Sequence, residues 1–372
     1  THPSAVPQKD LLQSATKGWS VVDKTTALAM TASSFYLGRD LSKELKVPVG
    51  IIDINLGSAY PLSWLSREAL METEKFFGDK EVMGQVSWHD KALEAELAGV
   101  PLKKKKTPPV DTVLRTLFPS GGYNAVLHPM QSLPLKAAAV QLGNDYPYMI
   151  YQNILDSDEP TNKNKLNTAY VECYNIRKVG FRMESKTTPR IARQWRKYLG
   201  NDDLPFGLIV PPGSDLNTLG QHHREMRELQ RLVAEKVPGV SVILPGSENI
   251  PFSAQPSDEK LLAERTLSWI LGSAYGHSKS TATGPQYEKF EANFNTATIF
   301  FKEGSAKGLN AISNDALNFF EVANVEGDYS VAKATIDGET IKLISDTITR
   351  IMRVRYNWNS RPNQHLVNES GI

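Results

Sequence analysis

Residues 205–210 read Pro-Phe-Gly-Leu-Ile-Val, a short apolar run that predicts a buried β-strand. The turn residues Pro211-Pro212-Gly213 end this run, and a helical pattern follows over about 217–236. A second apolar run, Val240 to Leu244, comes next. A strand, a helix and a strand in this order predict parallel pairing with a crossover helix, and therefore an α/β fold.

The same alternation extends in both directions along the chain. Parallel sheets form their sites at the carboxyl ends of the strands, so the loops at 55–60, 142–147 and 245–256 are expected to converge on one cleft. Further helices are predicted at 25–46 and about 257–275, and further strands at 49–54 and 135–141.

The pattern changes after Gly284-Pro285. Short β-like runs separated by Gly, Asp and Asn turns then predict a small antiparallel domain. We therefore expect three regions: an extended N-terminal segment at 1–24, an α/β domain at 25–284 and a β-rich domain at 285–372. Two long segments inside the α/β domain, 66–120 and 151–194, are interpreted as insertions of the kind that build lids or partner surfaces. The C-terminal β-like runs are 296–301, 319–325, 332–336, 340–344 and 351–356.

Composition excludes several classes of function. Forty per cent of the 372 residues are hydrophobic and 22% are charged, which predicts an ordinary buried core. The formal net charge of +1 gives no support for nucleic-acid binding, and no apolar run is long enough to span a membrane. Cys173 stands alone, so no intrachain disulfide is possible. Because the chain begins at Thr1 rather than Met, we expect a removed N-terminal piece and an extracytoplasmic location, whether periplasmic, cell-surface or secreted.

A series of short motifs, taken in order, resembles the sialate O-acetylesterase family of SGNH-type carbohydrate esterases. The resemblance covers roughly residues 20 to 372, and no single motif is specific. It implies an SGNH-hydrolase-like (flavodoxin-like) parallel sheet flanked by helices, followed by a C-terminal antiparallel β domain. The motifs are Phe35-Tyr36-Leu37-Gly38-Arg39-Asp40-Leu41, Gly57-Ser58 before Trp64, Tyr123-Asn124, Trp195-Arg196, Leu204-Pro205-Phe206, Arg227-Glu228-Leu229-Gln230, Glu264-Arg265 before Trp269, Phe320-Glu321-Val322-Ala323 and Asn368-Glu369-Ser370-Gly371.

The departures from the family fall on its chemistry. The family nucleophile lies in a Gly-Gln-Ser-Asn motif, which these 372 residues do not contain. The family's Asp-x-His-Pro box matches Ser253-Ala254-Gln255-Pro256, which would place Ser253 and Gln255 at the acid and base positions. An amide such as Gln255 cannot accept and return a proton, and residues 240–270 contain no histidine.

The resemblance implies that the anion-stabilising groups survive. Gly57 would offer its backbone N–H and Asn144 its side-chain amide to a developing oxyanion. Such donors alone retain some acceleration, but without a nucleophile and a base the triad mechanism is not available.

A relocated triad is the alternative. Ser58 would be the nucleophile, His128 the base and Asp145 the group that orients it. The opposing interpretation is that Ser58 is a turn residue and His128 a partly buried structural histidine. Glu248, an acid candidate, is otherwise a solvated loop carboxylate.

The other candidate sites in the sequence are weak. His222 and His223 are adjacent on a predicted helix and point about 100° apart, so no metal site is expected. His277 is interpreted as a cation at a helix C-terminus. Asn368-Glu369-Ser370 fits the glycosylation sequon, which is common by chance. No cofactor is expected.

The leading hypothesis is a catalytically silent relative of the sialate O-acetylesterases that serves as a carbohydrate-binding or structural subunit of an extracytoplasmic assembly. It predicts a glycan ligand, and a protein partner or self-assembly through the insertions. The alternative is an active carbohydrate O-acetylesterase that uses the relocated triad or a nucleophile on a separate N-terminal chain. Residues 1–24 would otherwise have to replace the first strand, and Trp19-Ser20-Val21-Val22 is the candidate stretch. A purely structural component, without sugar affinity, is the third class.

Overall fold

The computed structural model describes ten stretches of the chain, which divide into two units. The first unit comprises Thr1–Pro211 and Glu225–Val242, and the second comprises Pro212–Arg224 and Ile243–Ile372, so the division passes through one helix and one strand. The described stretches are 19–55, 61–69, 120–131, 133–142, 188–210, 217–245, 256–277, 283–312, 314–359 and 366–371.

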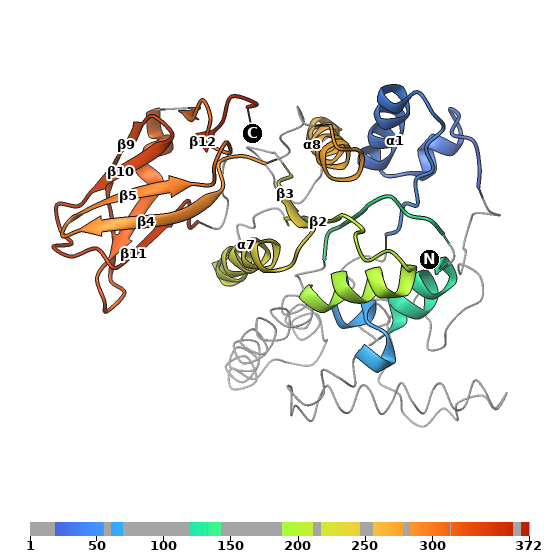
Figure 1. Ribbon diagram of the computed structural model, residues 1–372, viewed down its shortest axis with the longest axis horizontal. Coiled ribbons are helices and arrows are strands. Elements are labelled where there is room, and N and C mark those ends of the chain that lie inside the picture. The colour runs from blue at the N-terminus through green and yellow to red at the C-terminus, as the bar shows by residue number, and fades with distance from the viewer. Residues whose placement is uncertain are drawn as a thin grey trace, which may run out of the picture. The chain divides into compact units, whose positions relative to one another are not determined.

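A three-stranded sheet forms the centre of the α/β part (Figure 1). Its order is β1 (Ala138–Val140), β2 (Phe206–Ile209) and β3 (Val240–Ile243). β1 and β2 run parallel, with Ala138 opposite Phe206. The central strand β2 is almost entirely buried, as its unbroken apolar sequence predicts. The predicted α/β class with a parallel sheet is therefore confirmed.

Helices occupy the positions that the apolar period predicted. α7 (Asn217–Lys236) and α8 (Pro256–Tyr275) begin and end within one residue of the expected bounds. A further helix spans residues 188–199, so it begins inside the stretch interpreted as the second insertion and adds Ile191 to the core. Shorter helical turns are η2 (Pro61–Trp64), a π-helical turn η3 (Tyr123–Leu127) and η4 (His128–Met130).

The helix predicted at 25–46 is interrupted. A 3-10 turn, η1 (Thr26–Ala29), comes first, and Met30 is extended. α1 (Ala32–Leu45) then begins at Thr31, whose hydroxyl accepts a hydrogen bond from the backbone N–H of Ser34 at 3.3 Å. Such an N-cap satisfies an amide that the first helical turn leaves unpaired, which fixes the start of the helix. Lys46, in the left-handed conformation, ends it.

The strand predicted at 49–54 does not form. These residues make no sheet ladder, although Ile52 and Ile54 pack against the core of the first unit. The Asp53 carboxylate accepts a hydrogen bond from the backbone N–H of Thr31 at 2.7 Å. An apolar run alone cannot distinguish a strand from an extended segment that packs without a pairing neighbour. Residues 19–23 also form no strand, and Trp19 instead lies against Gly50.

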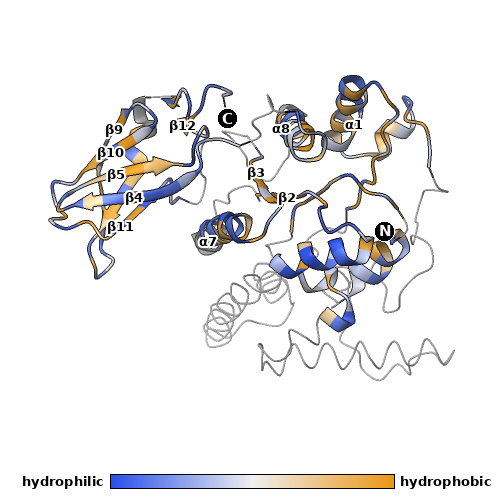
Figure 2. Cartoon of the chain, viewed as in Figure 1, coloured by the Kyte–Doolittle hydropathy of each residue, from blue (hydrophilic) through white to orange (hydrophobic). Residues whose placement is uncertain are grey.

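The core of the first unit gathers residues from distant parts of the chain. Trp195 is central to it, with its ring 5.7 Å from that of Trp64 and 5.4 Å from that of Phe206, measured between centroids. β2 and β3 are coloured as hydrophobic in Figure 2, whereas α7 alternates between hydrophobic and hydrophilic residues. Fully buried members include Leu65, Leu127, Ile191, Leu204, Phe206, Leu208 and Met226.

The C-terminal part of the second unit is antiparallel, as the pattern of short β-like runs predicted. Its largest sheet has the order β4-β5-β10-β9, and a second has the order β11-β7-β8. β5 and β10 match the predicted runs, whereas β4 and β8 were not predicted. The strands are β4 (Tyr287–Asn293), β5 (Thr296–Phe301), β6 (Asn310–Ala311), β7 (Phe320–Ala323), β8 (Tyr329–Val331), β9 (Lys333–Asp337), β10 (Thr340–Ile344), β11 (Arg353–Tyr356) and β12 (Leu366–Val367), with a 3-10 helix η5 (Asn314–Phe319) between β6 and β7.

β4 is the outer strand of its sheet in the described part of the chain, and most of its residues are exposed. Lys289 and Glu291 form an ion pair at 2.6 Å on this strand. The pairing with β5 shifts register between Tyr287 and Lys289. Figure 2 shows the contrast between hydrophilic β4 and hydrophobic β5. Among the described residues, no helix is long and apolar enough to cross a membrane.

Candidate functional site

Most of the predicted site residues lie outside the described residues. This holds for both oxyanion candidates, for the relocated nucleophile and its carboxylate, and for the two degenerate acid and base positions. His128 is the one member of the relocated triad that the structure describes. The residues outside the description are Gly57, Ser58, Asn144, Asp145, Glu248, Ser253 and Gln255.

The described strands lead to the predicted loops through buried residues. β1 continues into Leu142, and β2 continues into Val210, each of them buried. Because β1 and β2 are parallel, these two residues leave the sheet at the same edge. Of the three loops expected to converge, 142–147 follows β1 and 245–256 follows β3, whereas 55–60 follows a segment that forms no strand; most residues of these loops lie outside the described part of the chain.

Arg265 fixes the end of the third strand. Its guanidinium is buried, and Nη1 donates a hydrogen bond to the carbonyl oxygen of Leu244 at 3.2 Å. Burial lowers the pKa of Arg265. Leu244 is the residue after β3, so this contact from α8 anchors the chain where it enters the loop that carries Gln255.

His128 is half-buried and surrounded by aromatic rings. Its imidazole lies 6.3 Å from the ring of Tyr123 and 5.9 Å from the ring of Tyr198, measured between centroids. The two tyrosine rings lie 5.0 Å apart and meet edge to face. Three segments of the chain supply this group: η3, η4 and the helix at 188–199.

Tyr123, one of the two rings beside His128, is held as a neutral phenol. Burial raises the pKa of Tyr123, and a hydrogen bond with Tyr198 and the negative charge of Glu68 add to the effect. Tyr123 therefore stays a neutral phenol throughout the physiological range. The contact of His128 with Tyr198 was not predicted, because the two residues are far apart in the sequence. The imidazole lies beside this pair of tyrosine rings.

The motifs that carry the family resemblance hold the fold together. Arg196 is buried, and its Nε donates to the carbonyl oxygen of Leu204 at 2.9 Å while Nη1 donates to that of Pro238 at 2.7 Å. Leu204 lies just before β2 and Pro238 just before β3. Arg196 of the Trp-Arg motif thus sets the entry of two strands.

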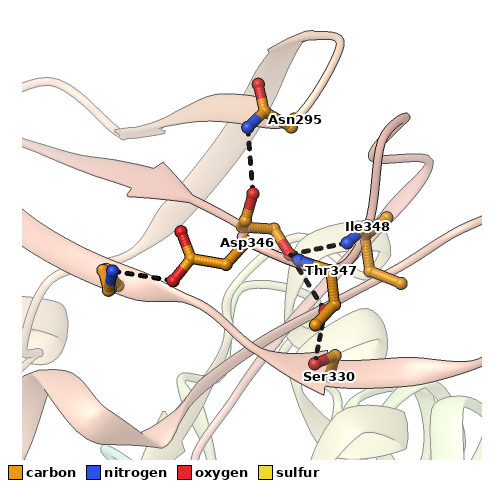
Figure 3. Close-up of polar contacts among 7 residues, drawn as sticks. Asn295, Ser330, Asp346, Thr347 and Ile348 are labelled. Carbon is orange, nitrogen blue, oxygen red and sulfur yellow. Dashed lines mark hydrogen bonds and ion pairs between the residues drawn. The ribbon is translucent and has the colours of Figure 1, made fainter.

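A polar cluster in the second unit is structural. In the turn after β10, the Ser345 hydroxyl accepts hydrogen bonds from the backbone N–H groups of Thr347 and Ile348 at 3.3 and 3.0 Å (Figure 3). The Asn295 amide donates to the Ser345 carbonyl oxygen at 2.9 Å, and the Thr347 hydroxyl bonds that of Ser330 at 2.8 Å. These hydrogen bonds stabilise the turn, and none of them indicates a ligand site.

The remaining histidines give no metal site in the described part of the chain. No group of three or more His, Cys, Asp or Glu side chains is placed there to hold a metal ion. His222 and His223 lie on the first turns of α7, and their side chains are outside the description. The backbone N–H of His277 donates to the carbonyl oxygen of Leu271 at 3.0 Å, across the left-handed Gly276 that ends α8.

Comparison with known proteins adds evidence on the fold. The chain is similar in structure to a carbohydrate acetylesterase from Xanthomonas citri, with a TM-score of 0.72 and 18% sequence identity. The similarity covers 100% of this chain and 69% of that protein. No protein-family model and no curated protein matches the sequence. At this level of identity the likeness establishes a shared fold.

Proposed function

We propose that this protein is a carbohydrate-esterase-like protein that binds an O-acetylated glycan and does not hydrolyse it. Two observations support the proposal. The whole chain shares its fold with a carbohydrate acetylesterase. The stretch from 240 to 270, where the resemblance places the catalytic base, contains no histidine and has Gln255 at the position of the base. The missing histidine is the observation that carries the proposal.

The finer assignment is an SGNH-type fold related to the sialate O-acetylesterases. In this assignment, Gly57 and Asn144 keep the donor positions and would bind the ester carbonyl of an acetylated sugar. These two donors would hydrogen-bond the carbonyl oxygen and so recognise the acetyl group. They would not cleave the ester, because turnover also requires a nucleophile and a base. We propose an extracytoplasmic location and a division into an α/β domain at 25–284 and a β domain at 285–372. Self-assembly or a protein partner at 66–120 and 151–194 belongs to the same proposal.

The alternative is an active carbohydrate O-acetylesterase. It requires Ser58, His128 and Asp145 to act together, or a nucleophile from a separate N-terminal chain. The fold likeness supports this alternative as much as it supports binding. His128 lies beside the rings of Tyr123 and Tyr198, and the alternative requires its imidazole to reach the nucleophile within hydrogen-bond distance, as a general base must.

Two measurements on the purified full-length chain separate these functions. The first is release of acetate from p-nitrophenyl acetate and from an O-acetylated sugar; we expect no turnover above that of Ser58→Ala and His128→Asn. The second is calorimetric titration with the same acetylated sugar and its deacetylated form; we expect binding that is weakened by Asn144→Ala. Turnover that Ser58→Ala abolishes would establish the esterase, and no affinity for either sugar would establish a purely structural component.

A further inference from the structure

The last described segment, residues 366–371, crosses two other parts of the second unit. We refer to it as the C-terminal strap. Its strand β12 pairs antiparallel with β6, with Leu366 opposite Ala311 and Val367 opposite Asn310. Beyond β12, the backbone N–H of Glu369 donates to the carbonyl oxygen of Lys307 at 2.8 Å. The strap therefore continues its backbone contacts past the end of the strand.

Asn368 is the central residue of the strap. Its side chain is buried, with 5% of its surface exposed. Both hydrogens of the amide have partners: Nδ2 donates to the carbonyl oxygens of Thr283 at 3.0 Å and Ser305 at 3.1 Å. The amide oxygen accepts from the backbone N–H of Ser370 at 3.0 Å. One side chain thus ties the strap to the segment that precedes β4 and to the loop between β5 and β6.

The loop beneath the strap is shaped to let it pass. Gly308 has a φ of +69°, and a Cβ at this position would lie 2.9 Å from the Cβ and 3.2 Å from the Cα of Glu369. A side chain at residue 308 would therefore push the strap away. Gly304, in the same loop, has a φ of +73°, and a Cβ there would meet nothing within 4 Å. The two glycines share the left-handed conformation and differ in their contact with the strap.

The sequence Asn368-Glu369-Ser370 is also an N-glycosylation acceptor motif. Attachment forms a bond between Nδ2 and the anomeric carbon of a lipid-pyrophosphate-linked sugar, which releases the lipid pyrophosphate and a proton. After attachment, Nδ2 of Asn368 keeps one hydrogen, whereas the closed strap uses both hydrogens to bond the carbonyl oxygens of Thr283 and Ser305. A bulky glycan also needs a surface position, which the buried amide does not offer.

We propose that residues 366–371 form a closing strap in which Asn368 is a structural lock, and that the acceptor motif is latent. The motif is open to a transferase only in chains whose strap is not closed. In the closed protein the amide serves Thr283 and Ser305, and it is not a modification site.

A matched pair of variants tests the lock. Asn368→Asp keeps the shape of the side chain but sets a carboxylate against two carbonyl oxygens, so we expect the unfolding temperature to fall by about 5 °C or more. Ser370→Ala destroys the acceptor motif and keeps the backbone N–H that Asn368 accepts from, so we expect a change below about 1 °C. Equal midpoints for Asn368→Asp and the unsubstituted protein would overturn the lock.

A second pair tests the latent motif and leaves Asn368 itself unchanged. Gly308→Ala should open the strap, whereas Gly304→Ala introduces the same backbone strain away from it. When the purified, folded full chain is incubated with an oligosaccharyltransferase and a lipid-pyrophosphate-linked sugar, we expect intact mass to show no glycan on the unsubstituted protein or on Gly304→Ala. We expect a glycan at Asn368 on Gly308→Ala, removed by adding Ser370→Ala. A glycan at Asn368 of the unsubstituted, folded protein would overturn the proposal, as would an unmodified Gly308→Ala whose Glu369 amide exchanges hydrogen rapidly.

Discussion

Arg196 donates a hydrogen bond from Nε to the carbonyl oxygen of Leu204 at 2.9 Å, and this contact connects the helix at 188–199 to the entry of the central strand. A second bond from Nη1 reaches Pro238 at 2.7 Å, before the neighbouring strand. Two strands of the sheet are thereby fixed by one buried guanidinium. Burial lowers the pKa of Arg196, and the charges of Asp203 and Asp202 raise it in opposition.

Replacing Arg196 by Met should destabilise the protein by about 2 kcal/mol, since the carbonyl oxygens of buried Leu204 and exposed Pro238 lose their donor while the aliphatic packing is kept. Arg193→Met is the control, because Arg193 is exposed on the same helix. Urea unfolding followed by tryptophan fluorescence would measure the difference. Equal midpoints for the two variants would show that the carbonyl groups find other donors.

In the second unit, Arg355 makes two bonds to the Glu321 carboxylate, at 2.8 and 2.9 Å, and its guanidinium lies 3.7 Å from the centroid of the Tyr329 ring. Arg355→Lys keeps the positive charge but loses the two parallel bonds to the carboxylate and the stacking on the tyrosine ring. We therefore expect the free energy of unfolding, measured by thermal denaturation, to fall by about 1 kcal/mol. Lys333→Met, which breaks the exposed pair with Asp346, should change stability by less than about 0.5 kcal/mol. A larger loss for Lys333→Met would contradict this ranking.

The Tyr356 hydroxyl makes the stability of the folded state depend on pH in the alkaline range. Burial raises the pKa of its hydroxyl above the ordinary value, and its ring packs 4.3 Å from that of Phe320. The folded state therefore holds the proton more tightly than the unfolded state. This contribution is full below the unfolded pKa of about 10 and is lost as pH rises from there through the folded pKa.

Tyr356→Phe should consequently narrow the gap in unfolding free energy between pH 8 and pH 11 by about 1 kcal/mol. Guanidinium titrations at the two pH values would measure it, with the more exposed Tyr287→Phe as the control. An unchanged gap would mean that the Tyr356 hydroxyl ionises equally well in both states.

Ser120 is buried in a left-handed conformation, with a φ of +60°. Its hydroxyl has no hydrogen-bond partner in the described part of the chain. Ser120→Gly removes the strain and the buried hydroxyl together, so we expect a gain of about 1 kcal/mol. Ser120→Ala removes only the hydroxyl and should gain less. A loss of stability in both variants would show that the hydroxyl has a partner outside the described residues.

The spacing of apolar residues predicted those helices and strands whose own sequence shows a clear pattern. α7, α8, β5 and β10 each carry an unbroken apolar period between clear turn residues, and their bounds were close to the observed ones. β4 was missed because charged residues lie along it and its pairing is made by the backbone, which the pattern of side chains does not record.

The candidate site was less accessible to sequence reasoning. The run at 49–54 has the composition of a strand, but a strand also needs a neighbour, and that depends on the rest of the fold. The tyrosines beside His128 come from residues 123 and 198, and no local period connects them. The role of Asn368 was hidden for the same reason, since its partners are 63 and 85 residues away.

The edge strand β4 bears on how this protein behaves at high concentration. An exposed outer strand offers free amide and carbonyl groups to any other chain with extended backbone. The ion pair of Lys289 with Glu291 and the register shift beside it make that row a poor template, because an incoming strand would have to bury charge and follow an irregular ladder. The second unit should thus resist growth into fibres, and neutralising both charges would remove that protection.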